Sequence, residues 1–278
     1  MQETGTLIKQ YRQHNSALRA LAWSPDGTRV ASAGDDQTVQ IWSTQGADHS
    51  LLYREHRDRV TAIAWSPDGT RVASAGYDQT VHIWDSTTGK RYYTYTGHSS
   101  SIWAMTWSPD GCYIASGGMD KTVQIWNSTT LKVILTYRGH EYGVLALAWS
   151  PDGKRIASAG YDKTVQVWSI AQHDDVLTYQ GHTKCVNAIA WSPSGNYLAS
   201  GSQDFTIHVW RSTNGQYFCK YIGHTNAVRA LAWSPVIRGR RGLTVYTLLR
   251  YERILSQLIL RFSQWLLYAI VVDQSNSY

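Results

Sequence analysis

The sequence predicts an all-β fold in which one small antiparallel sheet is repeated around a common axis. The first observation is a repeat, because two tryptophan series and one histidine series each return every 42 residues, which indicates a tandem array. The second is composition, since 13 Trp and 18 Tyr against 3 Phe indicate one aromatic position filled again and again. The third is length, because the apolar runs between turn residues are too short for helices and suit strands.

The elements of one repeat can be followed in order through residues 60–96. The run VTAIAW leads into the turn Ser-Pro-Asp-Gly, where Pro favours the second turn position and Gly the fourth. The run RVASAG comes next, and the turn A-G-x-D-x-T leads into a third run that ends in Val-His-Ile-Trp. Arg91–Thr96 supplies the fourth run. Four strands joined by short turns make a meandering sheet, and radial stacking of such sheets covers both of their faces.

These motifs resemble those of the WD40-repeat β-propeller family. The Ser-Pro-Asp-Gly turn and the Ile-Trp or Val-Trp end of the third run match the family pattern, which also includes Gly-His at Gly97-His98, Gly139-His140, Gly181-His182 and Gly223-His224. The resemblance covers residues 6–235 and departs from the pattern at Gln13, Glu55 and Ser194. It implies a propeller of five complete four-stranded blades plus an incomplete sixth. Repeats this alike are typical of bacterial members.

Each full unit contains a His, a Ser, an Asp and a Trp at fixed positions. His, Ser and Asp could form a nucleophilic triad, but five copies in one register favour a structural role, because an enzyme needs one such site. The resemblance implies a hydrogen-bonded tetrad in each blade, in which every buried polar group has a partner. The predicted tetrads are His14, Ser32, Asp36 and Trp42; His56, Ser74, Asp78 and Trp84; His98, Ser116, Asp120 and Trp126; His140, Ser158, Asp162 and Trp168; and His182, Ser200, Asp204 and Trp210.

No other cluster in the sequence indicates catalysis, a cofactor or a metal. His82 and His208 lie three units apart and are expected not to share a metal, and the run His173-Asp174-Asp175 is expected to be a solvated loop. The three cysteines have unrelated spacings, typical of a reducing compartment rather than a disulfide framework. The start of the chain has no signal-peptide pattern. We therefore predict a cytoplasmic protein that is not an enzyme and has no cofactor or metal.

Two positions of the repeat vary in chemistry while their surroundings hardly change. In the family both lie where the loop between the fourth and first strands meets the central channel, so the resemblance implies one shared rim. Aromatic, Met and Arg residues are enriched at interface hot spots; drift among exposed loop positions is the alternative. The predicted partner-binding face consists of Arg19, Arg59, Thr61, Tyr77, Trp103, Met119, Leu145, Tyr161, Asn187, Gln203 and Arg229.

The repeat pattern stops at Val236, which divides the chain into a propeller at 1–235 and a non-repeat tail at 236–278. Apolar residues at helical spacing predict an amphipathic helix over 248–272. A membrane span is not expected, because Arg261 and two glutamines interrupt the segment.

Two accounts of the incomplete blade stay open. Thr6–Arg12 matches a fourth strand and Ala227–Trp233 a first strand, so the middle strands are missing. Either the chain is a truncated or frame-shifted member of a longer array, or a strand within 242–250 substitutes while the helix plugs the gap. An open ring would expose blade edges, through which oligomerisation could occur.

The charge distribution does not favour nucleic-acid binding. The net charge is +6, but the tail holds six Arg and two acidic residues, so the repeats carry only +2 and nucleic-acid binding is not expected. The predicted function is a non-catalytic scaffold that presents propeller loops to protein partners, a step that rests on family analogy. The alternatives are a sensor or regulatory module of a larger system, such as a kinase or NTPase encoded elsewhere, and a gene fragment.

Overall fold

The computed structural model describes residues 11–44, 51–171 and 175–233, and the backbone of three short strands after them. Five four-stranded antiparallel sheets follow one another along the chain. The first two sheets contain β1 (Leu18–Trp23), β2 (Arg29–Gly34), β3 (Val39–Ser43) and β4 (Leu51–Tyr53), then β5 (Val60–Trp65), β6 (Arg71–Gly76), β7 (Val81–Asp85) and β8 (Arg91–Tyr95). The third contains β9 (Ile102–Trp107), β10 (Tyr113–Gly118), β11 (Val123–Asn127) and β12 (Val133–Tyr137). The last two contain β13 (Val144–Trp149), β14 (Arg155–Gly160), β15 (Val165–Ser169) and β16 (Val176–Tyr179), then β17 (Val186–Trp191), β18 (Tyr197–Ser202), β19 (Ile207–Arg211) and β20 (Tyr217–Tyr221).

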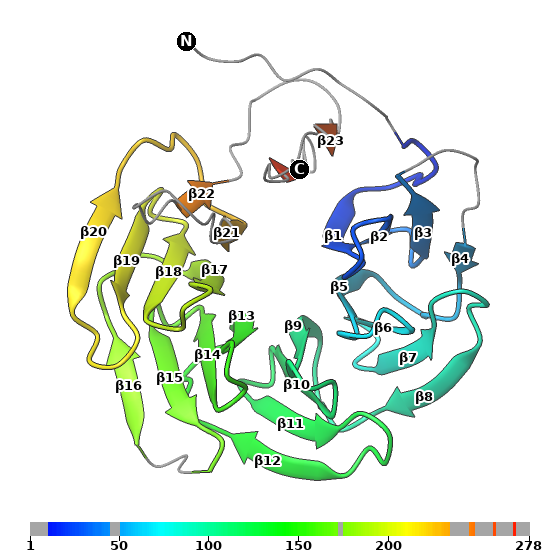
Figure 1. The fold of residues 1–278 in the computed structure, drawn as a ribbon, viewed down its shortest axis with the longest axis horizontal. Coiled ribbons are helices and arrows are strands. Elements are labelled where there is room, and N and C mark those ends of the chain that lie inside the picture. The colour runs from blue at the N-terminus through cyan, green and yellow to red at the C-terminus, as the bar shows by residue number, and fades with distance from the viewer. Residues whose placement is uncertain are drawn as a thin grey trace.

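The five sheets stand like blades around one axis. In Figure 1 the first strand of each sheet lies innermost and the fourth strand lies outermost, which is the propeller arrangement that the repeats predict. The second strand is buried most deeply, as in β6, where every residue from Val72 to Gly76 is buried. Small side chains suit this strand because neighbouring blades cover both of its faces.

Aromatic stacking joins each blade to the next. Tyr53, the last residue of β4, stacks on Trp84 of β7 with ring centroids 4.6 Å apart and an interplanar angle of 6°. The same pair recurs at the next three interfaces as Tyr95–Trp126, Tyr137–Trp168 and Tyr179–Trp210. The repeated stack explains the excess of Tyr and Trp over Phe, since both also use a polar group in hydrogen bonds.

The two ends of the array differ from the inner blades. At the N-terminal end Tyr11 stacks on Trp42 at 4.8 Å, so it takes the place of a fourth-strand Tyr from a preceding blade. At the other end all five residues of β20 are exposed, and Tyr221, which corresponds to the stacked Tyr of the other blades, is 50% exposed. The expected strand over Thr6–Arg12 lies mostly outside the described residues.

Past the fifth blade, β21 (Leu231–Trp233) pairs antiparallel with β22 (Val245–Thr247). A strand within 242–250 was one of the two accounts of the incomplete blade, and the pairing agrees with it. The first strand of this blade is shorter than the predicted Ala227–Trp233.

The predicted helix over 248–272 differs from the structure at the four positions described there. β23 (Leu258–Ile259) and β24 (Ala269–Ile270) are extended and pair with each other, and the rest of that range lies outside the described residues. The physical reason is that short runs rich in Leu and Ile suit a strand as well as a helix, so periodicity alone does not separate the two. In the part of the chain that the structure describes, no helix has the length and apolar character that a membrane crossing needs.

Candidate functional site

The structure brings the His, Ser, Asp and Trp of each repeat together. In the second blade His56 Nδ1 donates to Asp78 Oδ2 at 2.7 Å, Ser74 Oγ lies 2.7 Å from His56 Nε2, and Trp84 Nε1 donates to Ser74 Oγ at 3.1 Å. The third, fourth and fifth blades contain the same chain of hydrogen bonds. The first blade has the His–Asp and His–Ser contacts, but the buried Trp42 Nε1 has no hydrogen-bond partner among the described residues.

The hydrogen bonds of these tetrads suit a structural role and not nucleophilic catalysis. Ser74 is fully buried, and its hydroxyl accepts the Trp84 N–H, so a substrate carbonyl could not approach it. Burial by itself would raise the pKa of Asp120, but the hydrogen bond from His98 and the donors of Thr122 outweigh it and lower that pKa to about 2. An ionised Asp thus holds the loop before the first strand against the turn after the second strand of the same blade.

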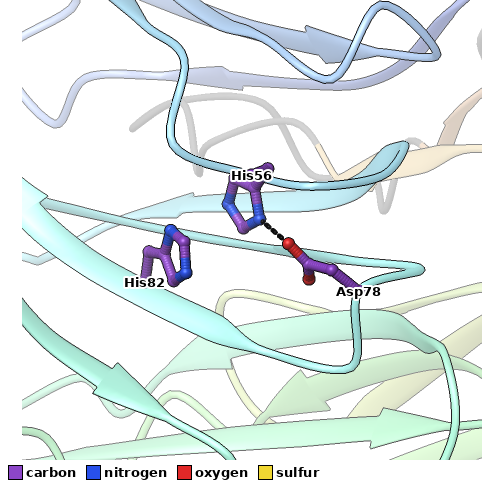
Figure 2. Close-up of side chains that lie close together, drawn as sticks. All are labelled: His56, Asp78 and His82. Carbon is purple, nitrogen blue, oxygen red and sulfur yellow. Dashed lines mark hydrogen bonds and ion pairs between the residues drawn. The ribbon is translucent and has the colours of Figure 1, made fainter.

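The second blade contains three side chains whose spacing resembles that of metal ligands. Ligand atoms of His56, Asp78 and His82 lie within 4.8 Å of one another, and Figure 2 shows the two imidazoles side by side with Asp78 bonded to His56. The rings stack at 4.1 Å. His82 Nδ1 lies 2.9 Å from the Tyr53 hydroxyl, and its Nε2 lies 3.1 Å from Thr80 Oγ1. Every ring nitrogen therefore already has a protein partner, and the group acts as a hydrogen-bond network between two blades.

The first variable position of the repeat has an unexpected backbone feature. In all five blades the second residue of the first strand is left out of the pairing with the second strand, which makes it the extra residue of a β-bulge. A bulge turns its side chain away from the regular alternation and is frequent next to functional sites. The bulged residues are Arg19, Thr61, Trp103, Leu145 and Asn187.

The second variable position lies beside the first. Its residue follows the last residue of the second strand, and its backbone N–H donates to the loop just before the first strand, as in Tyr77 N to Arg59 O at 2.9 Å. Asp35, Met119, Tyr161 and Gln203 make the equivalent bond. Both variable positions of one blade therefore lie at the same end of that blade, on the edge toward the channel.

A continuous polar and aromatic ladder crosses the first three blades at this rim. Arg19 Nε donates to Asp35 Oδ1 at 2.6 Å, and Arg59 Nε lies 3.9 Å from the same oxygen. The Arg59 guanidinium lies 5.7 Å from the ring centroid of Tyr77, and the Tyr77 ring lies 5.7 Å from that of Trp103. We call these five residues the rim ladder. Asp35 joins the two arginines, although the predicted face did not include it.

The other predicted rim residues separate into two groups. Thr61 Oγ1 donates to Ile102 O and Asn187 Nδ2 to Val228 O, so these two side chains join neighbouring blades. Met119 is 41% exposed. Arg229 is exposed, whereas Leu145, Tyr161 and Gln203 are half-buried.

Burial is the main cause that raises the pKa of Tyr161; Cys185 and then Tyr77 add to this, while Arg229 opposes it. Tyr161, Tyr77 and Arg229 come from three different blades. The signal for this shared surface in the sequence was the chemical variation of two positions in a nearly constant frame.

Comparison with known proteins agrees with this architecture. The family described as WD domain, G-beta repeat matches residues 5–43, 49–85, 89–127, 131–169 and 174–211. Each match ends with the third strand of a blade, so the family's unit joins the fourth strand of one blade to the first three of the next. No curated protein gives a significant match. The five matches cover more than half of the sequence, and the chain therefore belongs to the WD40-repeat family.

Proposed function

We propose that the channel rim binds a protein partner and that the chain serves as a non-catalytic scaffold. WD40 repeats are in general protein-interaction scaffolds, and the channel rim is the surface that we assign to this role. The observation that supports it is the β-bulge repeated in all five blades, because the residue left unpaired in each first strand is the chemically variable one.

The rim ladder has the composition of an interface hot spot. Arg, Tyr and Trp carry most of the binding energy in typical interfaces, and here one of each lies within contact distance of the next. Asp35 holds the two arginines of the ladder in place, since it pairs with both of them. A surface that is ordered before binding loses less side-chain entropy when the partner arrives.

The experiment compares two aromatic surfaces of one protein, the half-buried pair Tyr77 and Trp103 at the rim and an exposed ring elsewhere. The rim variant is Tyr77→Ala with Trp103→Ala, and the control is Tyr92→Ala, which removes a ring that is 44% exposed on the outermost strand β8. Tagged full-length chains are purified from the source cell, their folding is checked by thermal melting, and bound proteins are quantified by mass spectrometry.

We expect the rim variant to lose its specific partners by more than tenfold while the Tyr92 variant retains them. Equal recovery by the two variants, with both folded, would place the binding surface elsewhere. A charge reversal, Arg59→Glu, should lower recovery as well, because it breaks the contact with Tyr77 and repels Asp35.

A further inference from the structure

A pocket between the third and fourth blades belongs to neither the tetrads nor the rim. It has a volume of about 450 Å³ and is walled by Tyr113, Ile125, Ile134 and Trp149, with Asp110 and Asp152 among its polar residues. Its two Ser-Pro-Asp-Gly turns connect first strands to second strands. The rim lies at the other end of the first strands, so this pocket opens at the opposite end of the blades.

Three other blade interfaces show what fills the corresponding place. An arginine at the start of the second strand lays its guanidinium over the Trp that ends the next blade's first strand. The distances from the guanidinium carbon to the ring centroid are 4.7 Å for Arg29–Trp65, 4.8 Å for Arg71–Trp107 and 4.8 Å for Arg155–Trp191. Such cation–π contacts are favourable within about 6 Å of the ring centroid.

Backbone carbonyls complete this arginine site at two of the three interfaces. Arg29 Nη1 donates to Ser86 O at 2.9 Å and its Nη2 to Gly69 O at 3.2 Å. Arg155 repeats the pattern with Ser212 O at 2.8 Å and Gly195 O at 3.4 Å. The fold thus forms a guanidinium site from one indole face and two carbonyl oxygens of the following blade.

The interface between the third and fourth blades retains the walls of this site but not the arginine. Tyr113 stands 42 residues after Arg71 and before Arg155, at the arginine position. Trp149 supplies the indole, and Gly153 and Ile170, which correspond to Gly69 and Ser86, line the pocket. The phenol of Tyr113 carries no positive charge and cannot donate a fork of hydrogen bonds as a guanidinium does.

The charge of the pocket also suits a cation. Hydrogen bonds, led in each case by that of the neighbouring Ser hydroxyl, lower the pKa of Asp110 and that of Asp152, so both carboxylates are ionised at neutral pH. Lys154 is a basic residue of the same lining. Two acidic groups against one basic group leave a net negative surface around an indole face.

We propose that this pocket binds a guanidinium group, namely the side chain of an arginine in a protein partner. The site is independent of the channel rim, so either can fail without the other. The chain's own arginines at three sister interfaces are the template for the ligand.

The first test is a titration of the full chain with N-acetyl-arginine amide, followed by the indole N–H signals in NMR spectra and by calorimetry. Its matched probe is N-acetyl-citrulline amide, which has nearly the same shape without the charge. We expect arginine amide to bind at least tenfold more tightly, because the contact with the indole face and with two carboxylates depends on charge. No binding of arginine amide, or equal binding of citrulline amide, would overturn the proposal.

A titration with free arginine distinguishes a protein ligand from the free amino acid. A site for a partner's side chain should bind the blocked and free forms alike. Clear preference for the free amino acid would overturn the assignment to a protein.

The second test fills the pocket from within. Tyr113→Arg should place a guanidinium on Trp149 as at the sister interfaces, abolish binding of arginine amide and raise the melting temperature. Unchanged binding by the folded variant would show that arginine amide binds elsewhere.

Asp152→Asn gives a milder variant, in which the amide oxygen can still accept the turn hydrogen bonds, and binding of arginine amide should weaken several-fold. Asp68→Asn, the same change in the second blade, is its control and should leave binding unchanged; equal effects of the two would contradict the site.

Discussion

The interface between the first and second blades and the outer strand of the fifth blade are built from the same repeat, and their aromatic side chains differ in how far they are buried. In the interface, Tyr53 is buried and stacks on the fully buried Trp84. On the fifth blade Tyr221 occupies the same position of the repeat but is exposed, together with Tyr217, Phe218 and Ile222. The difference shows that the aromatic residues of a blade are buried by the neighbouring blade and not by their own sheet.

The N-terminal end of the array lies between these two cases. Tyr11 covers Trp42 as a fourth-strand Tyr would, and Trp42 is buried. However, Trp42 lacks the Ser hydrogen bond that its counterparts have. At the other end His224 Nε2 is also buried without a partner in the described residues, because the repeat's Ser and Asp do not occur after it. Stability in such arrays is approximately a sum of repeat and neighbour terms, so the ends should be weaker than the middle.

The largest expected effect comes from removing an inner indole. Trp126→Ala should lower the free energy of unfolding by about 3–5 kcal/mol, because it leaves a cavity at a fully covered interface. Trp42→Ala at the N-terminal end should cost less, since among the described residues only Tyr11 covers that indole from outside its own blade and it has no hydrogen bond to lose. Urea unfolding of both variants measures the difference, and equal losses would contradict the idea that neighbours determine stability.

A smaller effect is expected from one change made at two equivalent positions. Tyr137→Ser should destabilise the protein by about 2–4 kcal/mol, because Tyr137 is buried, stacks on Trp168 and donates to Gln166. Tyr221→Ser should cost no more than about 0.5 kcal/mol, as expected for an exposed side chain. If the two melting temperatures fell by the same amount, β20 would have to be covered in solution.

The two inner interfaces that contain His82 and His208 should make the stability of the fold depend on pH, unlike those with Gln at this position. Burial is the main cause that lowers the pKa of His82 to about 3 and that of His208 to about 4. The unfolded chain, with an ordinary His pKa near 6.5, binds more protons below that pH, so stability must fall as the pH falls from about 6.5 toward those values, by at most about 1.4 kcal/mol per pH unit for each histidine.

The double variant His82→Gln, His208→Gln tests this linkage. Gln stands at the corresponding position of the first, third and fourth blades, where Gln124 accepts the Tyr95 hydroxyl. The variant should unfold with a flatter pH dependence between pH 6.5 and 4 than the parent chain. Chemical denaturation at each pH gives the slope, and an unchanged slope would mean that these two histidines titrate alike in the folded and unfolded chain.

The smallest expected effect should not depend on position in the array. Lys163 and Gln37 both have positive φ, 67° and 63°, in the turn after the second strand, a conformation that disfavours side chains with a Cβ. Lys163→Gly and Gln37→Gly should each stabilise the chain by less than about 1 kcal/mol, because relief of the backbone strain is partly offset by the flexibility of Gly in the unfolded state. Thermal melting should show similar shifts for the inner and the terminal blade, and clearly unequal shifts would show that the turn senses its neighbours.

Sequence reasoning succeeded where a property belongs to one repeat. The 42-residue period, the four strands and the composition of each tetrad are local, because hydrogen bonding and burial within a sheet impose the same residue types on every copy. In the tail no second copy exists to compare, and the four described positions of the helix expected over 248–272 lie in the short strands Leu258–Ile259 and Ala269–Ile270. Leu and Ile suit both structures, and at the described positions the pairing of the two short segments with each other selects the strand.

The sequence by itself determined the propeller, its period and the two variable positions. Tertiary structure alone decided that the first variable position is a β-bulge, that Asp35 joins two arginines from neighbouring blades, and that His82 stacks on His56. It also brought Tyr113 and Ile170, 57 residues apart, into the lining of one pocket between two blades. The physical reason is that residue pattern reports how deeply a side chain is buried in its own sheet, whereas its partners are set by how one twisted sheet stacks on the next.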